Sequence, residues 1–199
     1  SSAASDVYKR QILSAASRLL AGKTLKVILL GEVEAVKKAA ADGSFDITGA
    51  EIIDPENYDG MDEMVEKMVV LRKGKMTAEQ CREALSKGNY FGTMLVKMGY
   101  ADALLGGATY STADTVRPAL QLVKTKPGAH LVSSCFILVR GEEKLAMGDC
   151  AINIKPTEDE LVEIAGIPDV LDYTISGHEC SAFKPDPEIY LRAMEALGV

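Results

Sequence analysis

The sequence predicts an α/β fold, a three-layer sandwich in which helices cover both faces of a mostly parallel sheet. Two observations support this class. Short apolar runs of strand length alternate with longer segments of helical periodicity over residues 12–165. The chain of 199 residues is also 47% hydrophobic, which supplies enough apolar material for a sizeable core. The same composition excludes a generally disordered chain.

The first part of the chain is predicted to begin with helix and strand in alternation. Apolar residues at helical spacing indicate a helix that ends before Gly22, and an unbroken apolar run then indicates a buried strand that ends at Gly31. Asp54-Pro55 closes a short second strand, and Thr77 provides an N-cap. The elements expected here are, in order, a helix over 12–21, a strand over 25–30, a helix over 33–41, a strand over 50–53 and helices over 61–73, 77–87 and 90–98.

The second part is predicted to complete the sheet. Gly106-Gly107 ends one strand, and Lys126-Pro127-Gly128 ends the helix that follows. Ligands of parallel sheets bind beyond the carboxyl ends of the strands, so the segments after the strands are candidate binding loops. The elements expected here are a strand over 101–105, a helix over 112–124, a strand over 130–139, a strand over 144–151 that pairs with it, and a helix over 156–165.

Charge and cysteine content exclude several classes of function. The net charge is −7, and residues 141–199 hold four basic against thirteen acidic residues, so we expect no nucleic-acid partner. The longest nearly apolar run, 131–139, is about half the length of a membrane span, so we expect no membrane partner. The cysteines follow no zinc or redox spacing and suit a reducing, cytoplasmic location. They are Cys81, Cys135, Cys150 and Cys180.

The most informative motif runs from Gly106 to Gln121. It places the hydroxyl groups of Ser111 and Thr112 at a helix start, where free N–H groups and the helix dipole favour phosphate. Arg117 follows about one turn later and is suited to bidentate contacts with phosphate oxygens. Any capped helix after a strand has a similar pattern, so the residues alone leave phosphate binding and an ordinary helix start equally open.

Three other features are weaker by themselves. Arg72 belongs to a basic cluster over 71–75, which also fits a solvated helix end whose cations oppose the dipole. The segment 89–94 is typical of a helix start with two aromatic residues in the core. Cys135 and Cys150 are expected to be core thiols and not nucleophiles.

Taken together, the segments 89–99, 107–128 and 149–157 resemble the phosphate acetyltransferase family, which interconverts acetyl-CoA and phosphate with acetyl phosphate and CoA. The resemblance covers about residues 11–165. It implies that CoA is a substrate, that no cofactor is required and that a homodimer forms. Many members have histidine where this chain has Tyr110, which leaves the role of Tyr110 open. The residues that match the CoA- and phosphate-binding positions are Arg72, Ser111, Thr112 and Arg117.

The resemblance also implies an incomplete domain. The Ser-Arg pair and the aspartate that the family uses near the CoA thiol have no counterpart, so the catalytic residues are unknown. We therefore expect little or no acetyl transfer from this chain by itself. The alternative is a non-catalytic fragment that binds CoA or other anions.

Residues 166–199 instead resemble the haloacid dehalogenase-like phosphatases. Lys184 matches the lysine that steadies the phospho-aspartate of that family, although a turn leading into an amphipathic helix explains the same residues. No Asp-x-Asp nucleophile motif is present, so a hydrolase of this class ranks third among the functions, and no metal site is expected.

The predicted parts are a non-native-looking leader over 1–11, a partial acetyltransferase domain over 12–165 and the phosphatase-like fragment over 166–199, which together suggest a chimeric or partial chain.

Overall fold

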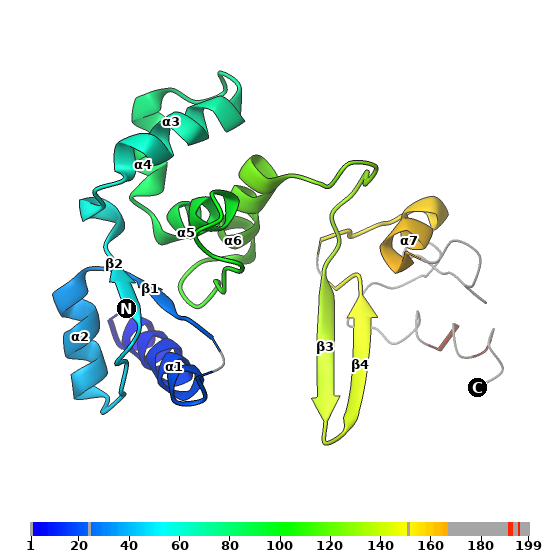
Figure 1. Ribbon diagram of the computed structural model, residues 1–199. Coiled ribbons are helices and arrows are strands. Elements are labelled where there is room, and N and C mark those ends of the chain that lie inside the picture. The colour runs from blue at the N-terminus through cyan, green and yellow to red at the C-terminus, as the bar shows by residue number, and fades with distance from the viewer. Residues whose placement is uncertain (1, 24, 151, 167–190, 193–194, 196–199) are drawn as a thin grey trace. The chain divides into compact units, whose positions relative to one another are not determined.

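The computed structural model describes residues 2–23, 25–150, 152–166, 191–192 and 195 (Figure 1). The chain divides into two compact units, Ser1–Lys124 and Thr125–Val199. No helix in the described part of the chain is long and apolar enough to cross a membrane.

The first unit contains a parallel strand pair. β1 (Ile28–Leu30) pairs with β2 (Glu51–Ile53), so that Leu29 lies opposite Ile52. The chain passes between these strands through α2 (Val33–Asp42), and α1 (Ser2–Ala21) packs against α2. A small core joins these elements through Leu13, Ala16, Leu29 and Ala40. Parallel strands joined through a helix confirm the predicted α/β class.

The larger core of this unit lies among the helices that follow. They are α3 (Met61–Arg72), α4 (Ala78–Leu85), α5 (Gly88–Lys97) and α6 (Thr112–Pro118), with a short 3-10 helix, η1 (Pro55–Asn57), before them and a π-helical turn, η2 (Ala119–Val123), after them. Phe91 is fully buried, and its ring meets that of Tyr58 edge to face, with centroids 5.1 Å apart. The core residues are Met64, Val65, Met68, Cys81, Ala84, Leu85, Phe91, Met94, Leu95 and Leu122.

Two helix starts show how local sequence fixes this architecture. Thr77 caps α4 as predicted, because its hydroxyl accepts from the Gln80 N–H while the Gln80 side chain accepts from the Thr77 N–H. α1 begins already at Ser2, so the helix includes residues 2–11, which composition had set apart as a leader.

The strand predicted over 101–105 is not formed. The backbone there has no regular structure, and Leu105 is 83% exposed. Leu104 packs instead over Gly92 of α5, where a Cβ would lie only 2.7 Å from a leucine methyl group. A short apolar run fits an extended linker as well as a strand, and here side-chain packing on a helix takes the place of strand pairing.

The second unit contains an antiparallel hairpin. β3 (Cys135–Arg140) pairs with β4 (Glu143–Gly148), so that Leu138 lies opposite Leu145, which confirms the predicted pairing. Side chains alternate between the two faces of a strand, so this register puts apolar residues on both faces. Phe136, Leu138, Leu145 and Met147 share one face, and Ile137, Val139 and Ala146 share the other.

Residues 130–134 lie outside β3, although the sequence predicts a strand from His130. Their backbone donors are bound by side chains: Glu163 accepts from the N–H groups of His130 and Leu131, and Asp149 accepts from that of Ser134. A side chain that binds a backbone N–H removes it from a strand ladder. Glu163 lies on α7 (Glu158–Ala165), which has a capping box formed by Thr157 and Glu160.

Acidification is expected to weaken the second unit through Glu163. The hydrogen bond from the His130 N–H, together with that from Leu131, holds the pKa of Glu163 below its usual value of 4.5. A carboxyl group whose pKa is lower in the folded state contributes stability that is fully present above about pH 4.5 and is lost as the pH falls through the folded-state pKa. In urea denaturation between about pH 6 and pH 3, the unfolding free energy of E163Q should therefore depend less on pH than that of the wild type.

Glu158→Gln provides the matched control. Glu158 is exposed at the first residue of the same helix. This variant should keep the pH dependence of the wild type, and a wild-type pH dependence in E163Q would contradict the prediction.

Candidate functional site

One carboxylate links two of the predicted binding residues. Ser111 caps α6, with its hydroxyl oxygen 3.1 Å from the Asp114 N–H nitrogen, and the same hydroxyl donates to Asp114 Oδ2 at 2.8 Å. Arg117 Nη1 donates to the other oxygen, Oδ1, at 3.3 Å. Ser111 and Arg117 therefore lie together around Asp114, and the Arg117 side chain is 55% exposed. Thr112 occupies the first turn of the same helix and is exposed.

Pro118 changes the helix directly after Arg117. It is the buried last residue of α6, and the chain continues as the π-helical turn Ala119–Val123. Proline lacks an N–H group and its ring crowds the preceding turn, so a regular ladder is disrupted here. Single π-helical turns are frequent at functional sites. The helix predicted over 112–124 is thus divided into two parts at Pro118.

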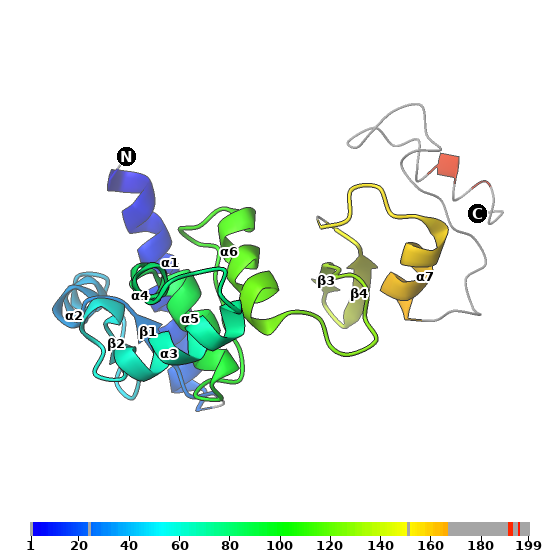
Figure 2. The same cartoon turned by 90° about the horizontal axis from the view of Figure 1, so that it is seen from above.

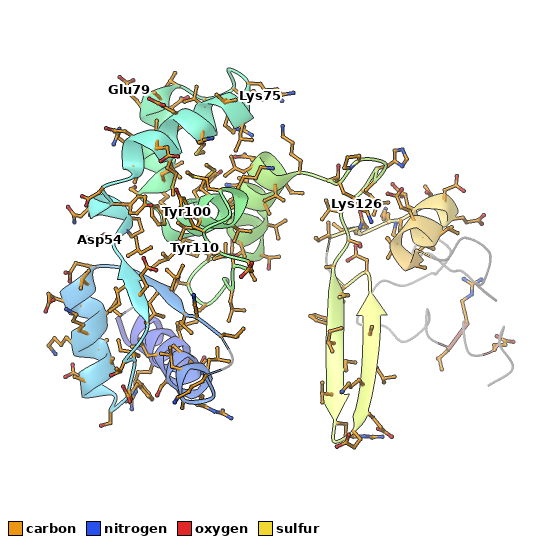
Figure 3. All side chains as sticks on the ribbon, in the orientation of Figure 1. Asp54, Lys75, Glu79, Tyr100, Tyr110 and Lys126 are labelled. Atoms are coloured by element: carbon orange, nitrogen blue, oxygen red, sulfur yellow. The ribbon has the colours of Figure 1, made fainter. Side chains whose placement is uncertain are left out.

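Arg72 contacts this turn from α3. It is the last residue of α3, and its Nη1 donates to the carbonyl oxygen of Gln121 at 3.5 Å. Its Nε is buried, and none of the residues that the structure describes accepts a hydrogen bond from it. Arg72 is half-buried, whereas Lys75 extends from the loop that follows α3 (Figure 3). A freely solvated helix end therefore does not describe Arg72, which touches the turn four residues after Arg117.

Two adjacent residues of α5 also reach this segment, and the sequence did not predict their role. Asn89 Nδ2 donates to the carbonyl oxygen of Asp114 at 2.7 Å, and the Tyr90 hydroxyl donates to Gln121 Oε1 at 2.9 Å. α5 packs against both α6 and the π-helical turn, and it lies beside α6 in both views (Figures 1 and 2). The sequence marks 89–94 only as a helix start with two aromatic residues, and this pattern does not indicate the two distant partners.

Tyr110 lies next to the start of α5. Its hydroxyl oxygen is 3.5 Å from the position that a Cβ would take on Gly88, the first residue of that helix (Figure 3). Tyr110 is therefore close to the helix that holds the Arg117 segment.

The remaining candidates lie elsewhere. The prediction that Cys135 is a core thiol is wrong, because Cys135 is exposed on the open hairpin, and Cys150 is half-buried. Lys184 and Cys180 fall within 167–190, outside the described residues. Among the residues that are described, no group of three or more His, Cys, Asp or Glu side chains could hold a metal ion.

The buried Cys81 is expected to react much more slowly with thiol reagents than Cys135. Burial raises the pKa of the Cys81 thiol, although Arg72 opposes the shift, and the thiolate is the reactive form. Alkylation of the native protein near pH 8, followed by peptide mass spectrometry, should label Cys135 well before Cys81. In denaturant the two thiols should react alike, and equal rates in the native protein would contradict the burial of Cys81.

Comparisons with known proteins identify close relatives of this chain. The family model described as phosphate acetyl/butaryl transferase matches residues 5–168. A phosphate acetyltransferase of Bacillus subtilis (strain 168) is 49% identical over 155 residues, which make up 78% of this chain and 48% of the relative. One from Staphylococcus epidermidis (strain ATCC 12228) is 40% identical over 188 residues, or 94% of this chain and 55% of the relative.

Solved structures agree with these matches. The EutD phosphotransacetylase from Staphylococcus aureus has a TM-score of 0.73 and 44% identity, over 81% of this chain and 48% of that protein. A phosphotransacetylase from Streptococcus pyogenes has a TM-score of 0.71 and 45% identity, over 79% of this chain and 48% of that protein. The chain spans about half the length of the curated relatives it matches.

Proposed function

This chain belongs to the phosphate acetyl/butaryl transferase family, and we propose that it takes part in transferring an acetyl group between CoA and phosphate. The observation that carries the proposal is the gathering of Arg72, Ser111 and Arg117 around α6 and its π-helical turn. Relatives named phosphate acetyltransferase support the choice of reaction.

The chemistry suits these residue types. In the transfer, a phosphate oxygen forms a bond to the acetyl carbon as the carbon–sulfur bond breaks, and the sulfur of CoA takes a proton. Two polyanions must come together for this step, so positive groups that offset their repulsion and hold them in position favour the reaction. Arg117 and Arg72 would provide this charge, and the hydroxyls of Ser111 and Thr112 would donate hydrogen bonds to phosphate oxygens. No described residue is assigned to the breaking of the bond itself.

The proposal also names the substrates, the cellular location and the oligomeric state. The ligands are acetyl-CoA, CoA, phosphate and acetyl phosphate, with CoA acting as a substrate and no additional cofactor. The protein would act in the cytoplasm as a homodimer, in acetate metabolism. The net charge of −7 supports the absence of a nucleic-acid partner.

Calorimetry with CoA, combined with an assay for release of the CoA thiol, tests the proposal. We expect CoA to bind, excess phosphate to compete with it, and affinity to fall with added salt because the contacts are ionic. Release of thiol from acetyl-CoA only when phosphate is present would establish the transfer. Binding without release would assign the non-catalytic alternative, and no binding of CoA would contradict the site.

A further inference from the structure

Two hydrogen bonds from neighbouring residues hold the segment that carries Arg117. The first, from Asn89 Nδ2, meets the carbonyl oxygen of Asp114 at 2.7 Å. The second, from the Tyr90 hydroxyl, meets Gln121 Oε1 at 2.9 Å. Arg117 lies between these two attachment points, about one helical turn from each. Both donors come from the start of α5.

The start of α5 is itself firmly held. Thr93 is only 4% exposed, and its hydroxyl donates to the carbonyl oxygen of Asn89 at 2.8 Å. The next residue after Tyr90 is the fully buried Phe91. Asn89 Oδ1 also accepts from the Tyr90 N–H at 2.9 Å. Asn89 and Tyr90 thus extend from the best-packed part of the first unit.

The Arg117 segment depends on such contacts because apolar burial alone fixes it incompletely. In α6 and the π-helical turn, the buried side chains are Pro118 and Leu122. Leu120 and Val123 remain 47% and 43% exposed. The polar contacts at Asp114 and Gln121 add a fixed direction to this apolar packing, because hydrogen bonds depend on geometry whereas apolar burial is non-directional.

We propose that Asn89 and Tyr90 are positioning residues that set the direction of the Arg117 side chain toward its anionic ligand. This inference rests on the proposed function, because it takes Arg117 as a ligand-binding residue. The inference gives a role to the segment 89–94, none of whose residues is among the proposed ligand-binding residues. Arg72 adds a third contact, since it donates to the backbone of the same Gln121 that Tyr90 holds.

The test compares CoA affinity in Y90F and N89A, each made in the wild type and in an R117A background. Tyr90→Phe removes only a hydroxyl group and keeps the ring, so it should fold even if Asn89→Ala is unstable. Each single variant should weaken CoA binding by about three- to tenfold, the range expected for one neutral hydrogen bond. In the R117A background neither should weaken binding further, because the residue that they position is gone. Y100F, which alters an exposed tyrosine of the same unit, should bind CoA like the wild type.

The outcomes separate the two proposals. If R117A weakens CoA binding while Y90F and N89A bind like the wild type, the positioning role is wrong and the binding site stands. The same conclusion follows if Y90F weakens binding equally with and without Arg117, which indicates a general structural effect. If the wild type binds no CoA, or R117A binds it as tightly as the wild type, the proposed site fails and the positioning role fails with it.

Discussion

Arg117→Ala is expected to weaken CoA binding by about 10- to 100-fold. A hydrogen bond to a charged group contributes about 1.5–3 kcal/mol, and each 1.4 kcal/mol changes affinity tenfold. The guanidinium of Arg117 is half-exposed, so a ligand can reach it, and its ion pair with Asp114 is a contact between exposed groups. Such pairs contribute little to folding, so the thermal midpoint should change little. Calorimetry at low salt measures the affinity.

Two further variants make this prediction specific. Arg82 is an exposed arginine of the same unit that pairs with Asp62, so Arg82→Ala removes one positive charge from a different ion pair. R82A should bind CoA like the wild type. Arg117→Lys keeps the positive charge but loses the planar guanidinium group that can make two parallel hydrogen bonds. The affinity of R117K for CoA should therefore lie between those of the wild type and R117A. If R82A weakened CoA binding as much as R117A does, net charge and not the position of Arg117 would explain the loss.

Phe91→Ala should lower the unfolding free energy of the first unit by about 3–5 kcal/mol. Removing a large buried side chain costs the transfer free energy of the lost atoms and leaves a cavity. Phe91 is fully buried and also loses its edge-to-face contact with Tyr58, 5.1 Å away between ring centroids. Urea denaturation followed by circular dichroism measures the change.

Phe136→Ala is the matched control, because the same substitution removes a ring that is 58% exposed in the second unit. Substitutions at exposed sites usually change stability by less than about 1 kcal/mol. If F91A were no less stable than F136A, Phe91 would not be a core residue.

The sequence predicted those elements whose signals are local. The cap of α4 at Thr77 follows from hydrogen bonds within one helical turn. The strand pair β1–β2 follows from two apolar runs on either side of a helical segment. The run over 101–105 carries a similar apolar signal, but Leu104 packs on Gly92 while Leu105 is 83% exposed, and the run pairs with no described strand. A short apolar run therefore does not by itself show that a segment is a strand or is buried.

The residues of the candidate site also fall into two groups, those that local spacing predicts and those that depend on contacts between distant segments. Ser111 and Arg117 lie within two helical turns of each other, so their relation could be predicted from spacing. Asn89 and Tyr90 contact partners 25 and 31 residues away, and no local pattern indicates such contacts. The π-helical turn was not predicted, because a proline after Arg117 fits either the first turn of a helix or a kink.

The π-helical turn makes the number of residues in this segment as important as their identity. Such a turn holds one residue more than an α-helical turn, so deleting Ala119 or Leu120 would let a regular helix continue past Pro118 while the later positions keep their faces. Inserting one residue at the same place would instead rotate every later position by about 100°, the angle of one residue in an α-helix. Leu122 would then leave the core, and Gln121 would move away from both Tyr90 and Arg72. A single-residue insertion here should therefore be more damaging than a single-residue deletion.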